Sequence, residues 1–318
     1  MQEGNRPLAN RSFMGIIGKF FKALVGDEVK EVLKKDIKKE KTYKVKYNDG
    51  DLTLRYKDCI HHTKGDFTSK DGLKYYKGDF YDGRPHGYGK FTFSNGDTYE
   101  GEVSEGFASG QGIYRYKNGD VYEGGFSLGG FFGYGILRFK SGSVYEGNWL
   151  ADKKYGYGRL EHANGDTYEG EWKDDEPHGV GAYYFNNGAS YEGEIFQGKY
   201  HGVGKASFAN GDYYEGEWQN GEMHGNGACS YADGSYYEGA FENGKYNGIG
   251  VLINTDGDKW GGNWIDGKMN GFAVMEMTDG TRFEGEFLNN LRHGWGTYVY
   301  PNGDEYEAYY QNGKEVNI

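Results

Sequence analysis

The sequence predicts an all-β protein, in which an elongated, twisted antiparallel sheet of 23-residue β-hairpins follows a short helical N-terminal segment. Three observations lead to this prediction. An aromatic side chain recurs every 23 residues, glycines recur at fixed offsets from it, and glycine and tyrosine are both abundant. Rings that pack over bare backbone are typical of β architecture.

The composition excludes two other classes of repetitive chain. The 318 residues include 57 glycines and 31 tyrosines but only 4 prolines. A collagen helix needs glycine at every third position together with abundant proline, which is not the pattern here. Aromatic residues make up 18% of the chain. A disordered chain would not hold so many rings in water.

The repeat register starts at Tyr76, taken as position 0, and continues for ten units without an insertion. Positions 11 and 20 are glycine in all ten units, and position 13 is glycine in nine, with Ala273 the exception. Such self-similarity indicates a repeat architecture. Position 0 holds Tyr76, Tyr99, Tyr122, Tyr145, Tyr168, Tyr191, Tyr214, Tyr237, Trp260 and Phe283. Position 2 holds Gly78, Gly101, Gly124, Gly147, Gly170, Gly193, Gly216, Gly239, Gly262 and Gly285.

Alternation within each unit predicts a hairpin. Positions 0, 2 and 4 fall on one face of the first strand, and the acids at positions 1 and 3 fall on the other. Position 7 is glycine, or else Asp152, Asp175 or Asn290, which all suit a turn with positive φ. Asn-Gly at positions 19 and 20 turns the chain into the next hairpin. The glycines at positions 2, 11 and 13 are expected to form grooves that rings of neighbouring units fill.

Three motifs of the unit resemble those of MORN repeats: Tyr168-Glu-Gly-Glu-Trp172, His178-Gly-Val-Gly181 and Asn187-Gly188. The resemblance covers residues 76–305, and a half unit follows at 306–318. It departs locally at Ser109 and Phe132, which stand where histidine is usual, and at Gly261, which replaces glutamate. MORN arrays occur beside lipid-kinase and methyltransferase domains, but the other 75 residues are too few for a kinase.

The chain before the repeats is expected to hold a partly helical basic segment (residues 1–41) and an irregular capping hairpin (residues 42–75). In the first predicted helix, an apolar stripe faces away from two lysines, and Gly15 and Gly18 weaken it. This helix could pack on the repeats, dock a partner or lie on a membrane surface. Its candidate docking residues are Phe13, Ile16, Ile17, Lys19, Phe20 and Lys22.

The net charge of −12 divides into +6 for residues 1–74 and −18 for residues 75–318. The acidic repeats should repel nucleic acid and anionic lipid headgroups. We therefore expect protein partners, no nucleic acid, and membrane contact only through residues 1–40. No apolar run approaches the roughly 18 residues that a membrane span needs.

The sequence predicts no catalytic, metal or cofactor site. Histidines at position 10 of adjacent units should lie about 10 Å apart, whereas zinc needs ligands within about 2.1 Å of the ion. Two cysteines, Cys59 and Cys229, imply no disulfide framework and suit a reducing compartment. The histidines in question are His86, His178, His201, His224 and His293.

Two apolar clusters are candidate interfaces. The larger lies in the last three units, where positions 12, 14 and 16 are unusually apolar, and is expected to contact a partner or a second copy of the chain, unless the N-terminal helices cover it. It comprises Ile249, Val251, Ile253, Phe272, Val274, Trp295 and Val299. The smaller cluster, in hairpin loops, comprises Phe107, Leu128, Phe131 and Phe132.

The resemblance implies a non-enzymatic scaffold for protein assembly. MORN proteins that resemble this chain are found in ciliary axonemes, notably radial-spoke heads, and in cytoskeletal structures, so an intracellular complex of this kind is expected. Two alternatives stay open. One is a membrane–cytoskeleton linker that binds phospholipid through the N-terminal helix. The other is a structural subunit of a mitochondrial complex, because residues 4–26 contain Arg and Lys but no acid.

Overall fold

The computed structural model describes residues 41–47, 50–56, 62–69, 74–82 and 84–317. These residues form strands and turns with no helix among them, which confirms the all-β prediction. The predicted N-terminal helices lie outside the described residues. The chain divides into two compact units. The first ends at Ala163 and also holds Trp172–Asp175, and the second holds Asn164–Glu171 and continues from Glu176.

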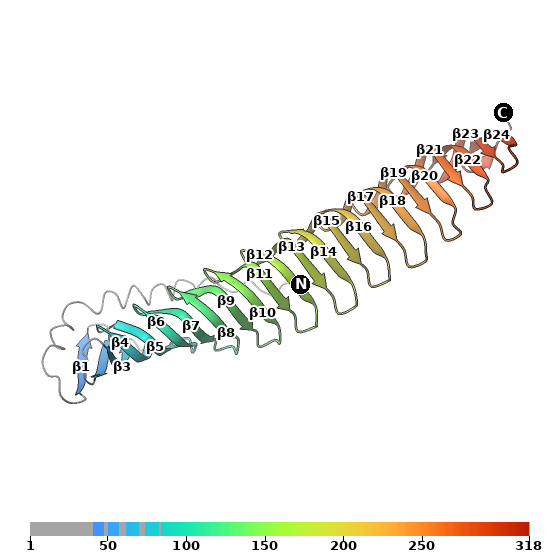
Figure 1. Cartoon of the computed structure of the whole chain (residues 1–318). Coiled ribbons are helices and arrows are strands. Elements are labelled where there is room, and N and C mark those ends of the chain that lie inside the picture. The colour runs from blue at the N-terminus through green and yellow to red at the C-terminus, as the bar shows by residue number, and fades with distance from the viewer. Residues whose placement is uncertain (1–40, 48–49, 57–61, 70–73, 83, 318) are drawn as a thin grey trace. The chain divides into compact units, whose positions relative to one another are not determined.

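In the first unit, each strand from β1 to β11 pairs antiparallel with its neighbours in the sequence. Figure 1 shows these strands side by side in chain order. The strands are β1 (Lys41–Tyr47), β2 (Gly50–Tyr56), β3 (His62–Ser69), β4 (Lys74–Tyr81), β5 (Arg84–Phe93), β6 (Thr98–Ser104), β7 (Phe107–Arg115), β8 (Val121–Ser127), β9 (Gly130–Arg138), β10 (Val144–Leu150) and β11 (Lys153–Glu161). β12 (Thr167–Lys173) has residues in each unit.

The second unit has the same organisation, with antiparallel pairing between consecutive strands from β13 to β25. Its last pair, β24 and β25, is the half unit that ends the repeats. The strands are β13 (Glu176–Tyr184), β14 (Ser190–Phe196), β15 (Lys199–Ser207), β16 (Tyr213–Gln219), β17 (Glu222–Ser230), β18 (Tyr236–Glu242), β19 (Lys245–Ile253), β20 (Lys259–Ile265), β21 (Lys268–Glu276), β22 (Arg282–Leu288), β23 (Leu291–Val299), β24 (Glu305–Gln311) and β25 (Lys314–Glu315).

From the second repeat unit onward, each hairpin turns through two residues with positive φ, at positions 6 and 7. The prediction for position 7 is confirmed by Asp152 and Asn290, with φ of 68° and 70°. Position 6 was not anticipated, because it holds residues as varied as Leu128 and Ala151, with φ of 49° and 50°. Two successive positive φ values define the tight turn whose twist matches that of the flanking strands.

A β-bulge interrupts the pairing inside repeat hairpins of both compact units, after the glycine at position 2. In the sixth unit, Gly193 pairs with Gly204, but the next pair is Ile195 with Tyr200. Position 11, here Gly202 with φ of 58°, absorbs the extra residues by adopting a left-handed conformation. The expectation that position 11 forms a groove for a ring is therefore wrong, since its glycine serves the bulge.

The core is built from tyrosine rings that lie over the glycine at position 13. A Cβ on Gly204 would fall 2.4 Å from the Tyr191 hydroxyl. That hydroxyl donates to the Glu194 carbonyl oxygen at 2.6 Å, so the ring is fixed at both ends. The ring comes from the same unit, which corrects the expectation that a neighbouring unit supplies it. Neighbouring units contribute indole rings, as when Trp218 Nε1 donates to the Gly204 carbonyl at 3.0 Å.

The ninth unit departs from this pattern in two places at once. Trp260 replaces tyrosine at position 0, and its ring is not among the nearest neighbours of a Cβ built on Gly262. Instead, the buried methyl group of Ala273 lies 2.6 Å from that Cβ position. Alanine can occupy position 13 here because no tyrosine ring needs the space.

Candidate protein-binding surfaces

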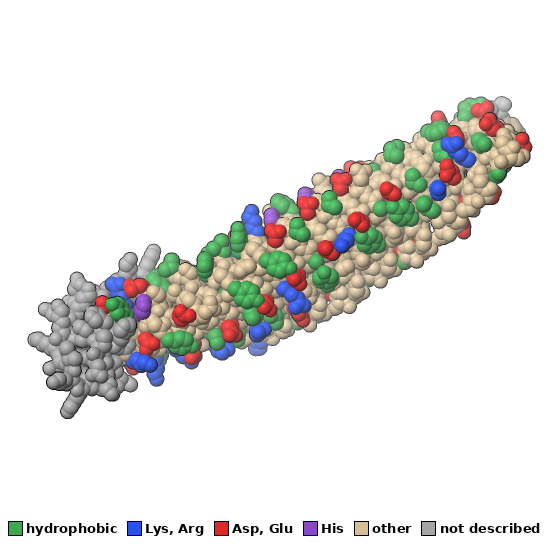
Figure 2. Space-filling model, viewed as in Figure 1, with side chains coloured by type: hydrophobic (Ala, Val, Ile, Leu, Met, Phe, Trp, Pro, Cys, Tyr) green, Lys and Arg blue, Asp and Glu red, His purple; other side chains and the backbone are tan. Residues whose placement is uncertain are grey.

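The outer face of each hairpin carries the side chains that alternate with the core. In β14, Glu192 and Glu194 are exposed while Tyr191 and Ile195 are buried. Position 12 on the second strand carries an exposed apolar side chain in most units, as at Val203, which is 60% exposed. Figure 2 accordingly shows hydrophobic and acidic side chains interspersed on the visible face.

The larger predicted cluster lies on this outer face, on β19, β21 and β23. Its three position-12 residues project furthest, with Ile249 72%, Phe272 61% and Trp295 53% exposed. Val251 is also exposed, whereas Ile253, Val274 and Val299 are half-buried. All seven side chains therefore reach the surface.

Strand pairing brings part of this cluster together around a glycine. Gly261 of β20 pairs with Val251 of β19 on one side and with Val274 of β21 on the other. Its φ lies outside the left-handed region, so the backbone does not require glycine there. A Cβ at Gly261 would make an ordinary 3.6 Å contact with Val251 Cγ2. Gly261 thus leaves a dent between two valines on the outer face.

The interruption of the acidic rows is a signal that the sequence analysis did not use. Position 1 is glutamate in eight units but glycine at Gly261. Position 3 is Ala240 and Asn263 in the eighth and ninth units, and it also lacks an acid at Gly125 and Asn148. Ile249 therefore lies opposite Asn263 rather than a carboxylate, whereas Phe272 has Glu286 opposite it on β22. We call the outer face formed by residues 240, 249, 251, 261, 263, 272, 274 and 295 the apolar face.

Acidic residues border the apolar face. Glu238 pairs with Val251 at one boundary, and Glu284 pairs with Val274 at the other. Glu286 also lies opposite Phe272. One of these acids is partly neutralised, because Arg282 Nη1 lies 2.6 Å from Glu284 Oε1. The border therefore favours a partner with basic groups around an apolar centre.

The smaller predicted cluster is only partly exposed. Leu128 is 74% exposed at its hairpin turn, Phe132 is exposed and Phe107 is half-buried. The expectation for Phe131 is wrong, because it is 7% exposed and its ring stacks on Tyr122 at 3.7 Å between centroids. Phe131 occupies position 9, just after the turn, where it pairs with Phe126. Its side chain points into the core.

The other predicted sites yield structural contacts or fall outside the described residues. The His178 ring lies 5.3 Å from the Phe196 ring, which supports a packing role at position 10. The described residues contain no group of three or more potential metal ligands. They also contain no helix long and apolar enough to cross a membrane. The candidate docking helix at residues 13–22 is not among them.

Comparison with known proteins identifies the repeat. None of the curated proteins matches the chain. Among solved structures, the chain is similar to a catalytically inactive virginiamycin B lyase from Staphylococcus aureus with quinupristin, at 16% identity over 85% of this chain and 87% of that one, with a TM-score of 0.14. This likeness is too weak to carry an argument.

The family model of the MORN repeat matches ten consecutive segments. The ninth match begins after Trp260 and Gly261, two of the residues at which that unit departs from the pattern. The matched residues are 76–98, 99–121, 122–144, 145–167, 168–190, 191–213, 214–236, 237–259, 262–282 and 283–305. They include more than two thirds of the chain, which therefore belongs to the MORN repeat family.

Proposed function

We propose that this protein is a non-enzymatic scaffold for protein assembly and that the apolar face is its main contact surface. MORN repeats imply a scaffold for protein or membrane interaction. The observation that carries the proposal is the coincidence of two changes on the same strands: the acidic rows lapse at Ala240, Gly261 and Asn263, and apolar side chains become prominent. Exposed apolar surface of this kind normally marks an interface.

The proposed occupant is a different protein with an apolar centre and a basic border. A second copy of this chain would bring its own Glu238 and Glu284 to the acidic border, which is unfavourable. Anionic lipid would meet the same repulsion. A projecting side chain of the partner would enter the dent at Gly261, while Phe272 and Trp295 would be covered at its edges.

The test compares two disruptive variants with a matched control. Phe272→Ser/Trp295→Ser removes exposed rings, and Gly261→Glu introduces the residue that eight other units hold at position 1. Val203→Ser is the control, because Val203 occupies position 12 and is 60% exposed but lies outside the apolar face. We expect a partner purified with the wild-type chain from native cells to bind both disruptive variants at least about tenfold more weakly and the control unchanged.

Equal partner binding by all four proteins would overturn the proposal. Sedimentation supplies a second criterion, since the wild-type chain without its partner should have the mass of a monomer. A dimer that both disruptive variants dissociate would instead make a second copy the occupant and refute the basic partner.

The setting that we propose is an axonemal or cytoskeletal assembly. The acidic outer rows support it, because they suit protein partners better than lipid headgroups. Fluorescence localisation of the tagged full chain in ciliated cells would test it. We expect label along axonemes or cytoskeletal fibres, and label confined to mitochondria or to membranes lacking such fibres would contradict the proposal.

A further inference from the structure

Carboxylates at position 3 have a repeated role in the described hairpins. In five units, the carboxylate accepts a hydrogen bond from the backbone N–H of position 12, nine residues later in the same unit. We call the place of this carboxylate the acceptor seat. The bonds join Tyr88 N to Asp79 Oδ2 (3.2 Å), Gln111 N to Glu102 Oε1 (3.0 Å), Val180 N to Glu171 Oε1 (3.4 Å), Val203 N to Glu194 Oε1 (3.1 Å) and Asn226 N to Glu217 Oε1 (2.8 Å).

The β-bulge explains why the seat needs an acceptor. Between the Gly193–Gly204 pair and the Ile195–Tyr200 pair, the bulge leaves Val203 without a regular partner on β14. The carbonyl of Glu194 accepts from the Tyr191 hydroxyl. The Glu194 side chain therefore supplies the acceptor for the Val203 N–H. Its carboxylate also covers Gly202, whose Cβ position lies 2.5 Å from Glu194 Oε2.

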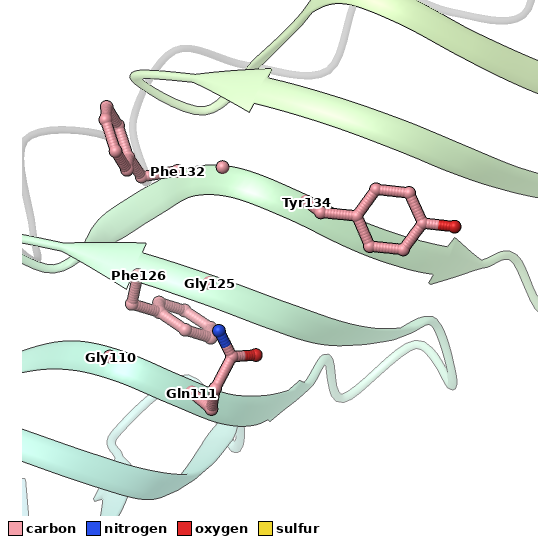
Figure 3. Close-up of a pocket in the computed structure, with 7 residues that line it drawn as sticks. Gly110, Gln111, Gly125, Phe126, Phe132 and Tyr134 are labelled. Carbon is pink, nitrogen blue, oxygen red and sulfur yellow. The ribbon is translucent and has the colours of Figure 1, made fainter.

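The third unit lacks this carboxylate, because position 3 is Gly125. Within the described part of the chain, no atom beyond its chain neighbours lies within 4 Å of a Cβ position on Gly133, the residue that a carboxylate would cover. A pocket of about 320 Å³ opens here, lined by Gly110, Gln111, Gly125, Phe126, Phe132, Gly133 and Tyr134 (Figure 3). The acceptor seat is thus uncovered beside Gly133, whereas Gly125 itself is buried and a Cβ built on it would lie 2.2 Å from the Phe132 carbonyl oxygen.

Two donors can serve an oxygen placed in this pocket. The first is the Tyr134 N–H, by its equivalence to the five N–H groups above. The second is the Gln111 side-chain amide, which points toward β8 in Figure 3. The seventh unit shows a similar pair of donors, since Asn226 offers both its backbone N and its Nδ2 (3.4 Å) to Glu217 Oε1.

The pocket also has apolar walls, and two of the neighbouring acids already accept hydrogen bonds. Phe132 and Tyr134 expose their rings, so an aliphatic stem can pack beside the donors. The Tyr134 hydroxyl donates to Glu146, and the Gln111 N–H donates to Glu102. Carboxylates in successive seats are compatible with the fold, because Glu171, Glu194 and Glu217 fill the seats of three consecutive units.

We propose that the pocket at Gly125 binds the carboxylate of a glutamate side chain in a protein partner. The glutamate would occupy the seat that an internal acid fills in five other units, and its neighbouring apolar residues would cover Phe132 and Tyr134. The pocket belongs to the first compact unit and the apolar face to the second. Either proposal can therefore fail without the other.

The experiment uses the full chain with ¹⁵N-labelled backbone amides and two synthetic probes. One is an acetylated, amidated pentapeptide with a single glutamate between leucines, and the other has glutamine in its place. We expect the glutamate peptide to shift the Tyr134 amide resonance and to bind about five- to tenfold more tightly than the glutamine peptide, since charge-assisted hydrogen bonds are roughly twice as strong. Gln111→Leu should weaken binding by a similar factor.

Matched variants distinguish the seat from general adhesion to the surface. Asn226→Leu removes an amide beside a filled seat and should leave binding unchanged. Glu194→Gly empties the seat of the sixth unit, so the peptide should then also shift the Val203 amide. The proposal is overturned if the Tyr134 amide does not respond, if both peptides bind equally, or if Gln111→Leu binds as tightly as the wild type.

Discussion

At the scale of single residues, the fold depends on pairs of glycines at which no Cβ can be placed. A Cβ on Gly193 would lie 2.4 Å from the Gly204 Cα, and one on Gly204 would meet the Tyr191 ring. These glycines have a packing role that is separate from turn formation. Gly261 differs, because a Cβ there would have room and would make only ordinary van der Waals contacts, the nearest at 3.6 Å from Val251 Cγ2.

The substitution Gly204→Ala should therefore destabilise the protein by about 1–3 kcal/mol, the usual cost of overpacking. Its Cβ would lie 2.4 Å from the Tyr191 hydroxyl and 2.7 Å from Cε2 of that ring. Gly261→Ala is the matched control and should change stability by less than about 0.5 kcal/mol. Urea midpoints followed by circular dichroism would compare them, and equal midpoints would refute this account of the core.

A second prediction concerns strain at Leu128. Its φ of 49° is unfavourable for a leucine, whereas asparagine tolerates the left-handed region and occupies the equivalent position at Asn220, with φ of 54°. Leu128→Asn should raise stability by about 0.5–1 kcal/mol, because strained positions cost about 1–3 kcal/mol each. Thermal unfolding would measure it, with Asn220→Leu as the reciprocal variant that should lower the midpoint.

At the scale of the hairpin, the sequence determined the strands and one turn residue, but not the bulge. Period-2 alternation and the glycine, aspartate or asparagine at position 7 were sufficient to predict the first strand and its turn. The bulge at Gly202 could not be read from alternation, since it shifts the register by residues that have no partner on the other strand of their hairpin. Because the bulge was not predicted, the ring over Gly204 was expected to come from a neighbouring unit, whereas it is that of Tyr191 in the same unit.

The candidate surfaces likewise differ in how far the sequence alone could predict them. The apolar face was predictable because positions 12, 14 and 16 keep their outward direction after the bulge. The burial of Phe131 was not predictable, because the turn at Leu128 determines which residues of the following strand point into the core. The pocket at Gly125 can be recognised as an empty acceptor seat only by comparison with the hydrogen bonds of other units. It could therefore not be predicted from the sequence alone.

At the scale of the whole molecule, buried tyrosines should control stability at high pH. Burial raises the pKa of Tyr246 from 10.0 to about 12, and burial also raises the pKa of Tyr191 and Tyr214. The neutral phenol is thus favoured by the folded state. This contribution to stability is complete below about pH 10 and declines as pH rises, because the unfolded chain then releases protons that the folded chain retains.

We therefore expect cooperative alkaline unfolding above about pH 10. Phenolate absorbance at 295 nm should rise in two phases, and the second phase should coincide with loss of the β-sheet signal in circular dichroism. Tyr246→Phe provides a control, since removing one buried phenol should move the transition slightly upward in pH. Complete titration near pH 10 with the sheet intact would contradict the prediction.

The hairpin ends also connect consecutive units through equivalent loops. Asp97 Oδ1 accepts from Lys117 N at 2.8 Å, and Asp212 Oδ1 accepts in the same way from Ala232 N at 2.9 Å, one unit further along in each case. Excising a whole number of 23-residue units between two loops that both carry this aspartate would join a loop to its counterpart and restore this bond. Gene duplication or loss of whole units can therefore change the number of docking positions without a new core, which makes length itself a heritable variable of this scaffold.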